Sequence, residues 1–229
     1  MNKITPSLIP VFILLFFLAN PSIAKPLASP DFFETVSKDS VESAAPGEKR
    51  SSYQLGLQIE NVVRTGYSNE MNYEYKPVLI QLEFQKSLSK KGKHGWQLDY
   101  LIQPQFNTVS FSETGINKRA GVVKTFEAGV NAGLMVLKSL VTIDEFRNIK
   151  MYALGSLGPH YIGESPSRQA KGFLFSDNLR VGLRIPVSSF IILDLRTGIR
   201  HLSNASLKAP NGGLDDVMFG AGIRFVRHE

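Results

Sequence analysis

From Tyr53 onward the sequence alternates, residue by residue, between apolar side chains and polar or small ones. The segment 190–203 is the clearest case. Its odd positions are almost all apolar up to residue 199, whereas its even positions include Asp194, Arg196 and Arg200. Successive residues of a β-strand point to opposite faces. The pattern therefore predicts strands that have one apolar face and one polar face.

Eight segments share this alternation, and the fifth of them alternates least clearly. They are 53–60, 78–85, 96–103, 126–134, 149–157, 173–184, 190–203 and 217–225. Eight is the smallest even number of strands found in outer-membrane barrels. The polar sides hold Gln, Glu, Asp, Arg, Asn and Gly. Small residues and paired charges of this kind suit the crowded lumen of a small barrel, which side chains fill.

The direction in which the apolar sides face separates two kinds of fold. A soluble barrel or sandwich turns its apolar residues inward, whereas a membrane barrel turns them outward to lipid. The apolar sides of this chain carry almost no charge, and several are capped by aromatic residues such as Tyr53, Phe84 and Trp96. We therefore predict an all-β fold, an eight-stranded antiparallel transmembrane β-barrel of the outer membrane. A soluble barrel or sandwich is the alternative.

The N-terminus has the features of a secretory signal peptide. Lys3 supplies a positive charge, residues 8–19 form an apolar run, and residues 22–24 form a small-x-small cleavage site. A membrane anchor is the alternative, but the apolar run is shorter than the roughly 20 residues that a spanning helix needs. The predicted organisation is a cleaved signal peptide at 1–24, a periplasmic leader or linker at 25–50 and a barrel at 51–229, located in the outer membrane.

The composition excludes several kinds of chemistry. The chain has no cysteine, which excludes disulfides, thiolate catalysis and cysteine-ligated zinc. His94, His160 and His228 fall outside the predicted strands without a metal-ligand spacing, so we expect them to be solvated. We expect neither a metal nor a cofactor. The net charge is +6 with no dense run of Lys or Arg, which fits an anionic membrane surface better than nucleic acid.

The lengths of the connections give the strands a direction. If the N-terminus lies in the periplasm, the connections after strands two, four and six are short turns and the others are extracellular loops. The longer connections are 61–74, 107–120, 159–170 and 204–214. The seventh strand then ends at the outer leaflet. His201 and Ser203, two residues apart at this end, share the lipid-facing side, as a general base and a nucleophile must.

The residues around this pair resemble the signature of a known family. The segment 201–215 reads HLSNASLKAPNGGLD. It is similar, without a gap, to the pattern His-x-Ser-Asn-Ala-x-Leu-Lys-x-Pro-Asn-x-Gly-x-Glu of the PagL-type lipid A 3-O-deacylases. A His-x-Ser pair alone is common by chance, but a string of this length is not. The resemblance implies an eight-stranded outer-membrane barrel with a serine–histidine–glutamate triad on the outside of its wall.

By this resemblance Ser203 is the nucleophile, His201 is its base and Asp215 is the carboxylate that orients the imidazole. Asp215 has the parity of the outer face, whereas Asp216 does not. The family pattern has Glu at this position, and Asp is one methylene shorter. The implied activity is a serine esterase that removes the 3-O-linked hydroxyacyl chain from lipid A of lipopolysaccharide. The expected partners are lipopolysaccharide in the outer leaflet and other outer-membrane lipids.

Three further positions are expected to support the oxyanion or the loop. Ser206 stands where the family pattern suggests glycine, at a position that contributes to the oxyanion hole. Asn204 and Asn211 are candidate donors to the oxyanion or to the loop backbone.

Three basic loop residues, Lys208, Arg168 and Lys171, are candidate contacts for the glucosamine phosphates of the substrate, because charge-assisted bonds to phosphate are strong. Two other functions remain open at this point. One is a non-enzymatic small outer-membrane barrel, and the other is an outer-membrane phospholipase that acts on glycerophospholipids.

Overall fold

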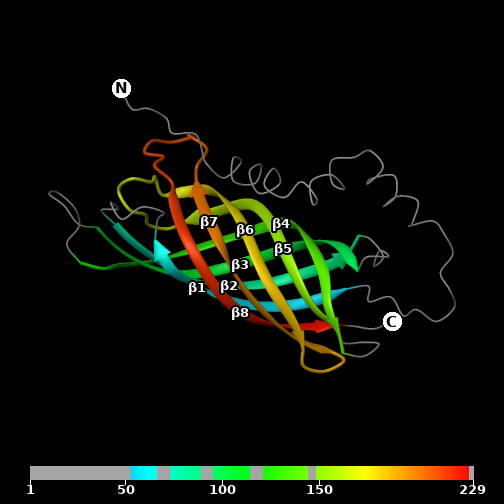
Figure 1. Cartoon of the computed structure of the whole chain (residues 1–229). Helices are drawn as coiled ribbons and strands as arrows, with labels where there is room; N and C mark the ends of the chain where they lie inside the picture. The colour runs from blue at the N-terminus through cyan, green and yellow to red at the C-terminus, as the bar shows by residue number, and fades with distance from the viewer. Residues whose placement is uncertain (1–52, 66–72, 89–94, 114–120, 144–147, 227–229) are drawn as a thin grey trace. The chain divides into compact units, whose positions relative to one another are not determined.

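The structure, a computed structural model, describes residues 53–65, 73–88, 95–113, 121–143 and 148–226. Within these residues, eight antiparallel strands pair in chain order and close into a barrel (Figure 1). They are β1 (Gln54–Thr65), β2 (Tyr73–Ser87), β3 (Trp96–Glu113), β4 (Val123–Thr142), β5 (Asn148–Ile162), β6 (Gly172–Pro186), β7 (Ile191–Ser203) and β8 (Leu214–Val226). The predicted eight-stranded antiparallel barrel is confirmed.

The outer surface of this barrel is apolar. Large hydrophobic side chains that are roughly half exposed occur on every strand except β7, among them Leu57, Ile80, Ile102, Leu134, Val181, Phe219 and Ile223. The described residues contain no helix with the length and hydropathy needed to span a bilayer. An apolar wall around a polar interior is the surface of a transmembrane barrel, and the soluble alternative is wrong. The predicted signal peptide and leader, 1–50, lie outside the described residues.

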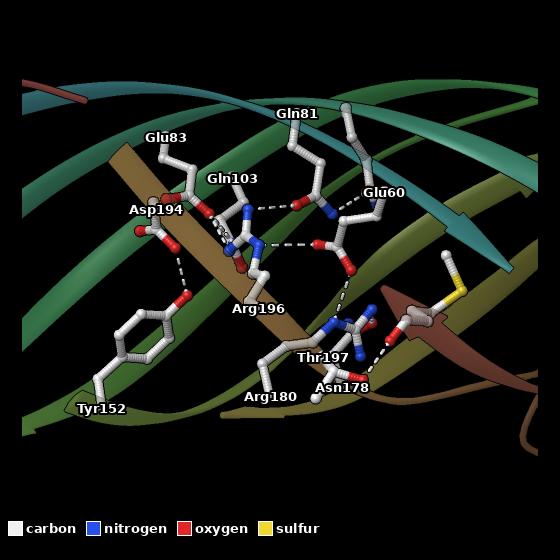
Figure 2. Close-up of polar contacts among 12 residues, drawn as sticks. Glu60, Gln81, Glu83, Gln103, Tyr152, Asn178, Arg180, Asp194, Arg196 and Thr197 are labelled. Atoms are coloured by element: carbon white, nitrogen blue, oxygen red, sulfur yellow. Dashed lines mark hydrogen bonds and ion pairs between the residues drawn. The ribbon is translucent and has the colours of Figure 1, made fainter. Parts of the chain in front are cut away.

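The interior at the middle of the barrel is a network of buried charges (Figure 2). Arg196 contacts Glu60 at 3.0 Å and Glu83 at 2.6 Å, and all three side chains are buried. Arg180 bonds the other carboxylate oxygen of Glu60 at 2.8 Å. Tyr152 donates a hydrogen bond of 2.6 Å to Asp194. Each charge therefore has a partner of opposite sign or a hydrogen bond, as a buried charge requires.

Several strands are longer than the alternation predicts, because the pattern reverses near the end of the barrel that we expect to be extracellular. In β2 and β3 the apolar residues there, including Tyr75, Val109 and Phe111, point inward, while Lys76 and Glu74 are exposed. These inward residues belong to a buried cluster that also contains Leu174, Leu202 and Leu214. A barrel that continues from lipid into water has to turn its polar residues outward there. Because the alternation is reversed there, the sequence analysis placed much of these strand ends in the predicted loops 61–74 and 107–120.

His160 is a second difference from the sequence prediction. It was expected in a solvated loop, but it lies in β5 with its side chain buried in the lumen. Its imidazole hydrogen-bonds to the buried Gln105 of β3. The prediction was wrong because β5 extends to Ile162, five residues past the segment that alternates in the sequence. His94 and His228 lie outside the described residues.

The buried ion pairs of Arg200 lead to a prediction about the stability of the barrel. Its guanidinium bonds Glu127 at 2.7 Å and Asp216 at 2.8 Å, with all three side chains buried. Replacing Arg200 by leucine leaves both carboxylates without this partner, so we expect a loss of about 3–5 kcal/mol in the free energy of unfolding. Denaturant unfolding in detergent micelles measures it. The exposed pair Lys76–Glu74 is the control, because Lys76→Ala should cost less than about 1 kcal/mol. An equal loss for the two variants would contradict the prediction.

Candidate active site

The register between β7 and β8 brings the predicted histidine and carboxylate together. His201 lies directly opposite Asp215 in the antiparallel pairing. On the lumen side, the flanking pairs are Arg200 with Asp216 and Leu202 with Leu214, and all four of these side chains are buried. A shift of either strand by one residue would turn its member of each pair to the outer face, and the ion pair and the packing would be lost. The interior of the barrel therefore determines which residues meet on its outside.

His201 and Asp215 form a hydrogen-bonded pair on the outer wall. His201 Nδ1 lies 2.7 Å from Asp215 Oδ1, and the two side chains are 15% and 19% exposed. Directly opposed residues in a sheet have Cβ atoms about 4.5–5.5 Å apart. At that separation an aspartate is long enough to reach the imidazole, although the family pattern has glutamate at this position. With Nδ1 bonded to the carboxylate, Nε2 is the nitrogen that can accept a proton.

Ser203 is the last residue of β7 and lies on the same face as His201. Its cross-strand partner on β6 is Phe175, whose ring packs edge-on against Phe173 at 5.0 Å. Among the described residues, no hydrogen bond joins Ser203 Oγ to His201. The contact between nucleophile and base is often loose in serine hydrolases without substrate. The structure therefore places the three predicted triad residues on one wall and joins two of them.

The loop 204–213 is held by its two asparagines. Asn211 Oδ1 accepts the backbone N–H of Asn204 at 2.9 Å, and Asn204 Nδ2 donates to the carbonyl of Lys208 at 2.6 Å. Asn211 Nδ2 donates to Ser206 Oγ at 3.3 Å. Of the two roles expected for these side chains, the contacts favour support of the loop backbone over donation to an oxyanion.

The backbone of Ala205 and Ser206 is left-handed, with φ values of 50° and 65°. Glycine adopts this region at no steric cost. This explains why the family pattern suggests glycine where this chain has Ser206. The backbone N–H groups of these two residues donate no hydrogen bond within the part of the chain that the structure describes. They are therefore the free donors nearest to Ser203 along the loop.

A second loop, 163–171 between β5 and β6, braces the first. Two backbone hydrogen bonds of 2.7 Å join them, from Gly212 N–H to the Arg168 carbonyl and from Ala170 N–H to the Pro210 carbonyl. Antiparallel bridge pairing between Gln169 and Asn211 lies between these bonds. The loop 204–213 is thus tied to a loop that is about 40 residues earlier in the chain.

Gln169 is a residue of the candidate site that the sequence did not reveal. Its side chain is 2% exposed, and its Oε1 accepts the backbone N–H of Gly213 at 3.0 Å. Gly213 has a φ of 69°, and a Cβ at this position would lie 2.7 Å from His201 Cε1. Gln169 therefore holds the backbone against which the imidazole rests. A single polar residue in a loop carries no sequence signal for such a role.

The three candidate phosphate contacts occupy different environments. Arg168 donates to the Gly212 carbonyl, and its guanidinium lies 5.2 Å over the ring of Tyr73. Lys171 forms an exposed ion pair with Glu164 at 2.8 Å. Lys208 is exposed. Arg168 and Lys171 are therefore engaged in contacts that shape the loops, and phosphate binding by the three stays a prediction. The described residues contain no cluster of side chains suited to a metal.

One family model matches the chain. Its description is lipid A 3-O-deacylase (PagL), and the match covers residues 82–224, which include the whole of β7 and almost all of β8. No curated protein sequence matches the chain closely enough to count as a relative.

Three solved structures illustrate what the fold is similar to. The outer membrane enzyme PagL has 15% identity and a TM-score of 0.42, covering 75% of this chain and 97% of that one. The outer membrane protein Ail of Yersinia pestis has 16% identity and a TM-score of 0.36, covering 78% and 100%. OprG from Pseudomonas aeruginosa has 8% identity and a TM-score of 0.42, covering 80% and 99%. None of these similarities is close enough to carry an argument.

Proposed function

The chain belongs to the lipid A 3-O-deacylase (PagL) family, and we propose that it is an outer-membrane serine esterase that removes the 3-O-linked hydroxyacyl chain from lipid A. The observation that carries the proposal is the 2.7 Å hydrogen bond between His201 and Asp215 on the lipid-facing wall, beside Ser203. A base oriented by a carboxylate next to a hydroxyl is the arrangement of serine hydrolases. The substrate is a lipid of the same leaflet, so its ester reaches the site from within the membrane.

The first half of the proposed reaction forms an acyl-enzyme. Asp215 accepts the Nδ1–H of His201, which leaves the Nε2 lone pair free to take the proton from Ser203. Ser203 Oγ attacks the ester carbonyl carbon and forms a tetrahedral oxyanion. The bond to the sugar oxygen then breaks, and His201 returns its proton to that oxygen. The products are the acylated serine and lipid A with a free 3-hydroxyl.

In the second half, a water molecule gives a proton to His201 and attacks the acyl-enzyme carbonyl, and the bond to Ser203 Oγ breaks as that oxygen regains the proton. A 3-hydroxy fatty acid leaves. The backbone N–H groups of Ala205 and Ser206 are the donors that we assign to the oxyanion. Donors to an oxyanion act most strongly in a site that excludes water, and the apolar wall supplies such surroundings.

The test of the proposal is a lipid analysis with the full chain folded in detergent micelles. Lipopolysaccharide and a glycerophospholipid are incubated with it separately, with heat-unfolded chain as the control. Loss of one 3-hydroxyacyl group from lipid A, detected by mass spectrometry, is the expected result. Free fatty acid from the phospholipid with unchanged lipid A would instead establish a phospholipase. If neither lipid gives a product, the result would favour a non-enzymatic barrel.

The brace between the loops predicts an effect of Gln169→Leu on this reaction. The variant leaves the buried N–H of Gly213 without its acceptor, so the backbone behind His201 shifts. Because small displacements of catalytic groups are costly, we expect kcat to fall by about 10- to 100-fold with KM little changed. Gln169→Glu keeps an acceptor oxygen and is the matched variant, expected to lose less. A fall in affinity alone, with kcat unchanged, would contradict the positioning role.

A further inference from the structure

Three aromatic rings gather on the outer wall, across β3, β4 and β5. Phe106, Phe126 and Tyr161 are each roughly half exposed. The ring of Phe126 stacks on that of Phe106 at 5.8 Å and on that of Tyr161 at 6.3 Å between centroids. The middle ring belongs to β4, which is three strands away from β7 around the closed barrel. This aromatic cluster is therefore separate from the wall that carries His201.

The backbone beside the aromatic cluster fixes the positions of its rings. Ala128 pairs with Phe106 on one side and with Tyr161 on the other, so only a small side chain separates these two rings. The carbonyl of Phe126 accepts the backbone N–H of Gly163 at 3.1 Å. A Cβ at Gly163 would lie 3.1 Å from Phe126 Cε1, so the ring rests against this glycine. The three rings form a supported surface whose outer side is open.

The aromatic cluster lies where the apolar wall ends. On β3 the next outward positions beyond the cluster are Thr108, Ser110 and Ser112. On β4 the outward residue beyond Phe126 is Lys124, which is exposed. Aromatic side chains prefer the boundary between membrane and water, with polar groups beyond them. The change occurs at the end of the barrel that we expect to be extracellular, so the cluster faces the outer leaflet.

Two lysines flank Ser110 in the row beyond the rings. Lys76 of β2 pairs with Ser110, and Ser110 pairs with Lys124 of β4. Neighbouring strands are about 4.8 Å apart, so the backbones of the two lysines are about 10 Å apart, a distance that two long side chains can close. Lys76 bonds Glu74 at 2.7 Å. Within the described residues, no carboxylate contacts Lys124, so its ammonium is available to a ligand.

We propose that this face binds one phosphorylated glycolipid of the outer leaflet, with its phosphate at Lys124, Ser110 and Lys76 and an acyl chain against the aromatic cluster. The order of chemistry on the wall matches that of the lipid, because a headgroup phosphate lies directly above the acyl chains. Charge-assisted bonds from lysine to phosphate are strong. A terminal phosphate has three acceptor oxygens, which suits three donors in a row.

This site goes beyond the proposed esterase and does not depend on it. Ser110 stands between two lysines in the strand register and has no histidine beside it as a base. The lipid is therefore held there and not cleaved. Basic side chains at the membrane surface attract anionic headgroups, and here the rings below them add an apolar contact.

The experiment measures lipid binding to the full chain in micelles of an uncharged detergent. The probe is a lipid A with one phosphate and without the acyl chain at position 3, so the proposed reaction cannot consume it. The same lipid without phosphate is the second probe. Native mass spectrometry counts the lipids that each chain retains and gives the apparent Kd of each. Circular dichroism checks that every variant is folded.

The chains are the wild type, Lys124→Gln, Phe126→Ala and the control Lys138→Gln. Lys138 is on the same strand and the same outward face as Lys124, and its ammonium lies 5.0 Å over the ring of Trp96 at the other end of the barrel. It therefore offers a cation beside an aromatic ring without the row of donors that flanks Ser110.

We expect the wild type to retain the phosphorylated probe here in addition to any lipid at the candidate active site. Lys124→Gln should weaken the binding of one phosphorylated lipid by about 10-fold and leave the phosphate-free probe unchanged. Phe126→Ala should weaken both probes, and Lys138→Gln should match the wild type.

Three results would overturn the assignment: no effect of Lys124→Gln, an equal effect of Lys138→Gln, or equal retention of the two probes by the wild type. An equal effect of the two lysines would mean a general attraction of cations for the phosphate. If the probe binds as expected but lipopolysaccharide releases no fatty acid, the proposed function fails while this lipid site stands.

Discussion

Replacing Ser203 by alanine will lower kcat for lipid A deacylation by about 10⁶-fold, the loss seen when the nucleophile of a serine hydrolase is removed. The variant keeps the His201–Asp215 pair and the barrel, so only the atom that attacks the carbonyl is missing. The residual rate then comes from the donors of the loop and from binding alone. Release of 3-hydroxy fatty acid from lipopolysaccharide, followed by mass spectrometry, measures the effect.

The matched control for this variant is Thr197→Val. Thr197 lies on the same strand and the same outward face as Ser203, and its hydroxyl donates to the Met218 carbonyl at 2.7 Å. It is six residues from the nucleophile, so we expect the rate to stay within about twofold of the wild type, as for substitutions away from a site. A Ser203→Ala chain with more than a tenth of the wild-type rate would remove Ser203 from the mechanism.

The second large effect is expected at Asp215. Asparagine in this position keeps the size of the side chain but removes the charge, and it favours the wrong tautomer of His201. We expect kcat to fall by about 10⁴-fold, as for the equivalent change in serine proteases. Asp215→Glu restores the residue of the family pattern and should retain or raise the activity. A severe loss in Asp215→Glu would show that Asp215 does not fill the glutamate role.

The neighbouring Asp216 is the matched control for Asp215. It is the same residue type one position later, but its side chain is buried in the lumen and bonded to Arg200. Asp216→Asn removes one charge of the interior network and should lower the free energy of unfolding while kcat stays near that of the wild type. If Asp216→Asn instead abolished turnover in fully folded chain, the division of roles between the outer and inner faces would be wrong.

Much of the fold and the placement of the triad residues could be predicted from the amino-acid sequence. Alternation over 190–203 indicates which side of β7 faces lipid, and parity alone places His201, Ser203 and Asp215 on that side and Asp216 on the other. Side-chain direction in a strand depends only on the backbone geometry, so it can be counted along the chain. The structure agrees with that count at all four positions. The roles of the triad residues stay predictions until the variants are measured.

The ends of several strands could not be predicted by counting residues along the chain. The reversal at the ends of β2 and β3 occurs because the barrel passes from lipid into water, and the alternation itself does not mark where lipid ends. His160 was misplaced for the related reason that the end of its strand was not visible. In both cases the surroundings of the strand change while its backbone does not.

The sequence by itself determined the alternating strands and the shared face on which the histidine, the serine and the aspartate lie, because side-chain direction follows from local backbone geometry. The structure decided that the strands close into a barrel with the apolar face outward. Only the tertiary structure decided which residues from distant segments meet at the site. Gln169 reaches Gly213 across 44 residues of sequence, and Phe175 meets Ser203 only through the register of β6 with β7. Such contacts depend on how strands and loops pair, and this pairing is established only when the chain folds.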